Sequence, residues 1–195
     1  MFFTILVFLL VALAAFCATV PYASLFEYLL HKYVMHRSFA GWKYPFHAHA
    51  IVHHGTFKAD HTYHLQVEED RKTIPMKWWN GPALIFVGSL PFLAGYFLFS
   101  HWIAVIVGGA SCCVGYYATY EYFHWCMHLP KNRWFERTQW FRFINGHHVL
   151  HHRYMGYNFN VVLQMWDLLL GTLMVRSSRD FIQVQGPSVP NLQPR

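Results

Sequence analysis

Ten of the fifteen histidines fall into four short clusters whose spacing is typical of metal ligands. The clusters are His31 and His36; His49, His53 and His54; His124 and His128; and His148, His151 and His152. Neutral imidazole is a good ligand for iron, zinc and copper. The sequence therefore predicts a metal site that is built mainly from nitrogen ligands.

The spacing within a cluster limits which rings can reach one ion. Residues four apart on an α-helix lie about 40° apart around its axis, so they project from one face. This spacing separates His124 from His128, and we expect both rings to approach the same metal. The same argument predicts a shared metal for His49 and His53.

The doublets are expected to serve two metals. Neighbouring residues on a helix diverge by about 100°, so the rings of His53–His54, or of His151–His152, cannot easily bind one ion. His31 and His36 lie about 140° apart on an ideal helix. Either each of these two serves a different metal, or the helix is locally distorted there.

The pattern of clusters occurs twice along the chain. Each half contains a hydrophobic segment, a spaced histidine pair, a polar connection, and then a histidine followed by a His-His doublet. We expect each half to supply about half of a binuclear site.

Four carboxylates lie near these histidines in the sequence. A carboxylate that accepts the ring N–H of a ligand fixes the tautomer of that ligand. Glu27 and Glu121 are candidates for this role, because they precede cluster histidines by four and three positions. Asp60 and Asp167 are candidate partners for the two doublets. The alternative for both glutamates is a capping or interfacial role.

The remaining histidines are expected to be structural. They are His47, His61, His64, His101 and His147. Two of them are reserves for a neighbouring ligand: His47 for His49, and His147 for His148. Cysteine is not expected to contribute ligands, because no C-x-x-C occurs and Cys126 lies on the far side of a helix from the nearest histidines.

The composition places the chain among membrane proteins. It is 55% hydrophobic and 12% charged, about half the charge of a typical soluble domain. Segments without any charge predict an anchoring span at about 2–20 and a helical hairpin at about 82–99 and 102–120, with a polar turn at Ser100–His101. We expect a single all-α integral membrane domain over 1–195. It would have about three to four transmembrane helices and a helical cytoplasmic cap that carries the histidines.

The distribution of basic residues predicts the orientation. All fifteen Lys and Arg residues lie in 32–77 or 131–195, so the histidine regions 27–77 and 121–195 are expected on the cytoplasmic face. The membrane would be a bacterial inner membrane or the endoplasmic reticulum. The net charge of +6 fits contact with anionic lipid headgroups, and no nucleic-acid partner is expected.

The histidine clusters resemble the histidine boxes of the fatty acid hydroxylase/sterol desaturase superfamily of membrane proteins, which have the patterns H-x3-4-H and H-x2-3-H-H. The resemblance runs from about Glu27 to Leu173. The segment from His147 to Tyr154, followed by Asn158–Val162 and Trp166–Thr172, looks most like the fatty acid hydroxylase branch. One departure is the gap of three residues before His53, where acyl hydroxylases commonly have two.

This resemblance implies a function. The ten cluster histidines would hold two iron ions, with zinc as a substitute in purified protein. The enzyme would use O2 and two electrons to insert oxygen into a C–H bond of a membrane lipid, above all a fatty acyl chain. The sequence has no haem-binding, flavin or nicotinamide signature, so a separate cytochrome b5-like or ferredoxin-like donor would supply the electrons. The basic stretches 131–133 and 137–142 would dock it; contact with lipid headgroups is the alternative for these residues.

Several alternatives remain open at this point. A desaturase, a sterol-type oxidase or a carotenoid ring hydroxylase would use the same histidine boxes. From another class, a membrane metal transporter or metal-binding protein is an alternative, although transporters place polar ligands within their spans. A haem-binding electron carrier is a third.

Overall fold

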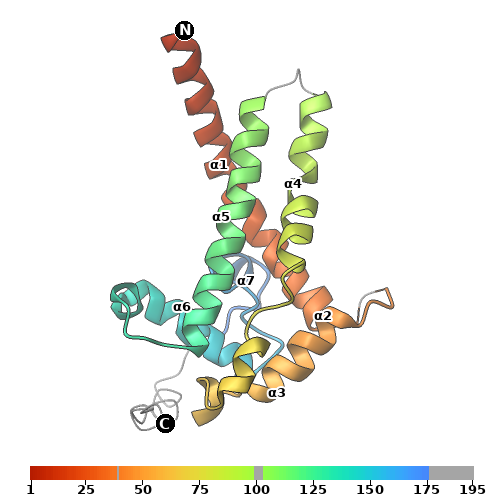
Figure 1. Ribbon diagram of the computed structural model, residues 1–195, viewed down its shortest axis with the longest axis vertical. Helices are drawn as coiled ribbons and strands as arrows, with labels where there is room; N and C mark the ends of the chain where they lie inside the picture. Colours follow the sequence, from red (N-terminus) through yellow and green to blue (C-terminus); the bar gives the residue numbers. More distant parts are fainter. Residues whose placement is uncertain (39, 99–102, 176–195) are drawn as a thin grey trace.

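The computed structural model describes residues 1–38, 40–98 and 103–175. Within these ranges the chain consists of helices and loops without a strand. Three helices are long and apolar enough to cross a membrane: α1 (Phe2–Leu30), α4 (Asn80–Leu98) and α5 (Ile103–His128) (Figure 1). The prediction of an all-helical chain with three candidate spans is confirmed. The expected turn at Ser100–His101 and the segment 176–195 lie outside the described residues.

Two of the spans continue further than predicted. Helix α1 runs to Leu30, where a π-helix, η1 (His31–Met35), continues it, and α5 continues past residue 120 to His128. The predicted boundaries stood where the first polar side chains appear. The helices continue because those polar side chains face the interior of the protein, where Glu27 and His31 are buried and hydrogen-bonded.

The remaining elements form a helical cap over residues 36–38, 40–77 and 129–175, at the end of the long helices opposite the N-terminus (Figure 1). Its first part is one continuous helical segment, followed by two 3-10 turns. The bounds are α2 (Tyr44–Phe46), π-helix η2 (His47–His53), α3 (His54–Thr56), η3 (His61–Tyr63) and η4 (Glu68–Thr73). The second part contains η5 (Trp134–Arg137), α6 (Gln139–Arg153) and α7 (Met165–Leu169).

Helix α6 is positioned by a cap and by its apolar face. The Thr138 side chain accepts a hydrogen bond from Phe141 N–H, which satisfies one of the free donors at the start of the helix. Phe141 and Ile144 recur at helical spacing and pack in a core with the end of α5. That core consists of Tyr63, Cys126, Met127, Phe141, Ile144, Val149 and Val161. The same face of α6 then presents its histidines to the interior.

A glycine brings α1 and α5 into close contact. A Cβ atom on Gly108 would lie 2.1 Å from the Ala12 carbonyl oxygen and 2.9 Å from the Ala15 Cβ. Only a residue without a side chain fits at this crossing, and membrane helices commonly approach one another through such small residues. The crossing fixes α1 beside α5. His31 begins η1, the continuation of α1, and His124 lies on α5.

We expect Gly108→Ala to destabilise the protein by about 1–3 kcal/mol through overpacking at this crossing. Gly115→Ala on the same helix is the matched control, because a Cβ there meets nothing within 4 Å. A helical glycine replaced by alanine in open space is neutral or gains up to about 1 kcal/mol. Thermal unfolding in detergent measures both. Equal stability of the two variants would contradict the close crossing.

Candidate metal centre

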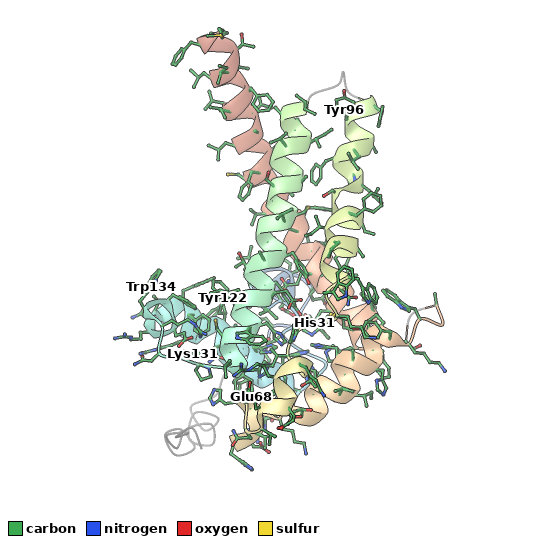
Figure 2. The ribbon with its side chains drawn as sticks, viewed as in Figure 1. His31, Glu68, Tyr96, Tyr122, Lys131 and Trp134 are labelled. Carbon is green, nitrogen blue, oxygen red and sulfur yellow. The ribbon has the colours of Figure 1, made fainter. Side chains whose placement is uncertain are left out.

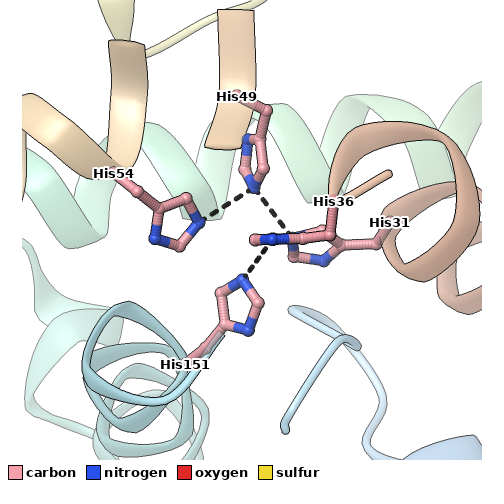
Figure 3. A group of neighbouring side chains, drawn as sticks. All are labelled: His31, His36, His49, His54 and His151. Atoms are coloured by element: carbon pink, nitrogen blue, oxygen red, sulfur yellow. Dashed lines mark hydrogen bonds between the residues drawn. The ribbon is translucent and has the colours of Figure 1, made fainter. Parts of the chain in front are cut away.

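The ten cluster histidines meet where α1 and α5 enter the cap, in two groups of five. The first histidine group contains His31, His36, His49, His54 and His151 (Figure 3). The second histidine group contains His53, His124, His128, His148 and His152. Within each group, one ring nitrogen from every member lies within 4.8 Å of the others. Nine of the ten rings are buried, and His36 is partly buried.

The Nε2 atoms of the first histidine group converge on a common centre. His49 Nε2 lies 2.9 Å from His31 Nε2 and 3.2 Å from His54 Nε2. His36 Nε2 lies 3.0 Å from His151 Nε2. Two nitrogens at right angles around an ion, each about 2.1 Å from it, would be about 3.0 Å apart. The spacing of these rings therefore fits ligands around one metal ion.

The second histidine group has the same geometry. His53 Nε2 lies 3.1 Å from His124 Nε2. His148 Nε2 lies 3.2 Å from His128 Nε2 and 3.1 Å from His152 Nε2. The two groups adjoin, because the rings of His54 and His152 stack with their centroids 4.2 Å apart. The arrangement fits two neighbouring metal ions.

A local π-helix brings His31 and His36 together. The His36 N–H donates to the His31 carbonyl at 3.0 Å, the i→i+5 bond that defines this geometry. The wider turn brings residues five apart onto one face. Of the two alternatives that the sequence left open, local distortion is the one observed, and both rings belong to the first histidine group.

A second π-helix changes the pairing in the next cluster. In η2 the residues that share a group are His49 and His54, five apart, whereas His53 belongs to the other group. The prediction that His49 and His53 approach one metal is therefore wrong, because it assumed α-helical spacing. His124 and His128 lie on the regular helix α5 and do share a group, as predicted.

Both doublets divide between the two groups, as their spacing predicts. His53 and His152 belong to the second histidine group, and His54 and His151 to the first. Adjacent residues on a helix point in directions about 100° apart, so each doublet reaches both centres.

Backbone carbonyls of the cap orient the rings of the second histidine group. Three ring Nδ1 atoms lie within hydrogen-bond distance of carbonyl oxygens in residues 57–73. The pairs are His53 with Thr73 at 3.1 Å, His128 with Tyr63 at 2.8 Å, and His152 with Phe57 at 2.5 Å. A carbonyl accepts only from a protonated Nδ1, so the Nε2 lone pair of each ring faces the centre of the group.

Backbone carbonyls of the loop that follows α6 orient two rings of the first histidine group. The Nδ1 of His31 is hydrogen-bonded to the Phe159 carbonyl, and that of His151 to the Tyr157 carbonyl at 2.7 Å. Lone pairs that converge at about 3 Å repel one another unless a proton or a cation lies between them. A bound cation is therefore the natural complement of both groups.

The cluster histidines outside the candidate spans are held neutral. Burial lowers the pKa of His36 to about 2, that of His53 to about 3 and that of His151 to about 4. For His36, neighbouring histidines lower the pKa further. The pKa values of His49, His54, His148 and His152 lie well below their usual range for the same reasons. Neutral imidazole is the form that binds metals.

The structure gives Glu27 partners other than His31. Its carboxylate accepts hydrogen bonds from Tyr116 OH at 2.6 Å, from Asn160 Nδ2 at 3.1 Å and from Val161 N–H at 2.5 Å. The predicted contact with His31 is wrong, because a backbone carbonyl occupies that ring nitrogen. Glu27 instead anchors the loop that carries this carbonyl.

Asp167 is a second anchor of the same loop. It is fully buried and accepts from Phe159 N–H at 2.9 Å, Asn160 N–H at 2.7 Å and Thr172 Oγ1 at 2.7 Å. The predicted contact between Asp167 and the second doublet is wrong. The residue acts on His31 and His151 through the carbonyls of the loop that it holds.

Asp60 and Glu121 also lie apart from the predicted histidines. Asp60 caps η3 by accepting from Thr62 N–H at 2.8 Å, and half of its side-chain surface is exposed. Glu121 accepts a hydrogen bond from Tyr117 OH at 2.9 Å, where a contact with His124 was predicted. It lines a cavity between the long helices.

The reserve histidines stay outside both groups. His47 is exposed, and His147 is buried with its Nδ1 2.8 Å from the Phe143 carbonyl. His61 is exposed and His64 partly buried, and neither belongs to a group. His101 lies outside the described residues. The structure thus places His49 and His148, not their reserves, among the converging rings.

Comparison with known proteins adds no identity. No family model matches the chain, no curated protein matches it, and no solved structure matches it. The case for a function therefore rests on the site itself.

Proposed function

We propose that this protein is a di-iron hydroxylase that uses O2 to insert oxygen into a C–H bond of a membrane lipid, above all a fatty acyl chain. The proposal places it with the fatty acid hydroxylase/sterol desaturase superfamily. The observation that carries it is the position of two adjoining groups of five neutral imidazoles beside an apolar cavity between candidate membrane helices.

The ligand set fits iron. Within the described residues, the two groups contain imidazole nitrogen alone, which suits iron and also accepts zinc when iron is scarce. Two bound iron ions would supply the activation of O2. The overall reaction consumes one O2, two electrons and two protons, and it converts a C–H bond to C–OH with release of one water.

The cavity fits a lipid tail. It lies between α1, α4 and α5, and its lining is almost entirely apolar. Phe26, Leu30, Leu84 and Ile85 are among the apolar side chains that line it, and His31 of the first histidine group also contributes to its wall. An acyl chain could enter from the membrane and reach the metal site while these side chains exclude water.

The charge distribution supports an electron donor on the side of the cap. Glu68 and Lys131 mark this end of the molecule, which also carries the histidines, whereas Tyr96 marks the opposite end (Figure 2). The basic residues of 131–142 would attract an acidic carrier such as a cytochrome b5-like or ferredoxin-like protein. By the positive-inside rule this face would be cytoplasmic, in a bacterial inner membrane or the endoplasmic reticulum.

Product analysis tests the proposal. The full chain is expressed with an electron donor, and the host lipids are compared by mass spectrometry with those of a host that expresses His31→Ala. We expect a lipid that gains the mass of one oxygen atom only with the wild-type chain, while His61→Ala, outside both groups, still produces it. Loss of two hydrogens would identify a desaturase instead. Tightly bound metal without any oxidised lipid would contradict the proposal.

A further inference from the structure

One carboxylate faces the apolar cavity without a full set of partners. Glu27 and Glu121 both line the cavity, but they differ in their hydrogen bonds. Glu27 accepts bonds at both of its oxygens. Glu121 accepts one, from Tyr117 OH to Oε1, and its Oε2 has no hydrogen-bond donor among the described residues. The cavity therefore presents one open acceptor.

Neither helix capping nor an ion pair accounts for Glu121. It lies inside α5, seven positions before the end of the helix at His128, so it does not cap a terminus. Within the described ranges, no Lys or Arg nitrogen lies at ion-pair distance from it. A carboxylate in apolar surroundings costs several kcal/mol unless hydrogen bonds compensate for the lost water. Glu121 is partly buried and its Oε2 is not enclosed by the chain, so this oxygen is open to a donor that enters the cavity.

The side chain is held in place on its cavity wall. Tyr117, which donates to Oε1, packs against the start of α4, where a Cβ on Gly81 would lie 2.8 Å from the Tyr117 ring. The glycine thus leaves room for the tyrosine to reach Glu121. An acceptor fixed in this way can select a ligand by the position of its donor.

Glu121 lies close to the metal site. It precedes His124 by three residues, a rise of about 4.5 Å along the helix. The Tyr120 ring, which also lines the cavity, stacks on the ring of His124 at a centroid distance of 5.8 Å. His31, of the other group, shares the same wall. A group bound at Glu121 therefore lies within about one helical turn of the reacting end of the cavity.

We propose that Glu121 binds a hydroxyl group of the substrate, so that the substrate is a lipid alcohol rather than an unsubstituted hydrocarbon chain. The hydroxyl donates its hydrogen to Oε2, and the tail occupies the apolar part of the cavity. A neutral hydroxyl enters such a cavity at a much lower desolvation cost than an ammonium group. This inference rests on the proposed function in naming the substrate class of the same site.

Equilibrium binding of a matched pair of probes tests the proposal. Radiolabelled 1-hexadecanol and hexadecane differ by one hydroxyl, and each is titrated against the metal-loaded full chain in nanodiscs. We expect a preference for the alcohol of about 10- to 100-fold, the size expected for one hydrogen bond to a charged acceptor. Glu121→Leu should reduce this preference at least tenfold with metal content unchanged. Comparison with the wild type cancels the different partitioning of the probes into lipid.

Two further variants complete the test. Glu121→Gln keeps an acceptor oxygen and should retain part of the preference, whereas Glu69→Gln on the exposed part of η4 should retain all of it. An unchanged preference in Glu121→Leu would overturn the assignment. Oxidation assays separate this result from the proposed function. Oxidation without alcohol preference removes only the role of Glu121, whereas alcohol preference without any oxidation removes only the hydroxylase.

Discussion

Replacing His151 and His152 together with alanine is expected to lower the bound metal from two ions per chain to less than one and to abolish lipid oxidation. The two rings belong to different groups, so the double variant removes one of five ligands from each. Loss of a ligand weakens a metal site far more than loss of an orienting partner, for which about 10- to 100-fold is typical. Elemental analysis of purified protein measures the metal, and lipid mass spectrometry measures the activity.

The single variants sharpen this test. His151→Ala should affect mainly the first histidine group and His152→Ala mainly the second, so each is expected to retain close to one ion. His61→Ala is the matched control, because His61 is exposed and belongs to neither group. Full metal content in the double variant would show that these rings are not ligands.

Replacing Asp167 with alanine is expected to destabilise the fold and to empty only the first metal position. The change leaves three donors without their acceptor: Phe159 N–H, Asn160 N–H and Thr172 OH. Unsatisfied buried donors cost about 1–3 kcal/mol each, so the loss for three donors is about 3–9 kcal/mol. The loop also orients His31 and His151 through its carbonyls. Denaturation in detergent and metal counting measure the two effects.

A conservative change at the same position and a change at a distant exposed position serve as controls for Asp167→Ala. Asp167→Asn keeps one acceptor oxygen and should cost about half as much, because two donors can still bond to it. Glu69→Ala, on an exposed turn of the cap, should change neither stability nor metal content. If Asp167→Ala lost both ions equally while remaining folded, the separate support of the two groups would be wrong.

The backbone carbonyls that orient the histidine rings link the two halves of the chain. His128 and His152, from the second half, bond to carbonyls of residues 57–73. His31, from the first half, bonds to the Phe159 carbonyl in the second. The sequence predicts that each half supplies about half of the site. The structure adds that each half also orients rings of the other.

The sequence predicts the candidate spans and the histidines that meet in the two groups, and it does so for physical reasons. An uncharged stretch that is long enough to cross a bilayer predicts a membrane-spanning helix, and this pattern locates α1, α4 and α5 in the sequence. The division of each doublet follows from the angle between adjacent helical residues. Both features depend on local sequence alone.

The pairing within the groups could not be derived in the same way. It depends on two π-helices, and only the five-residue spacing of His31 with His36, and of His49 with His54, pointed toward them. The contacts of the carboxylates do not follow from their proximity to histidines in the sequence. Glu27 and Asp167 accept hydrogen bonds from a loop that is distant from Glu27 in the sequence and that the fold brings to it. The backbone carbonyls that orient the histidine rings cannot be identified from residue types, because every residue has one.

Anomalous diffraction at the iron edge, from crystals of the iron-loaded full chain, tests the central claim most directly. The account predicts two neighbouring peaks, one among the Nε2 atoms of the first histidine group and one among those of the second. A single peak, or peaks at exposed histidines such as His47 or His61 with both groups empty, would contradict it.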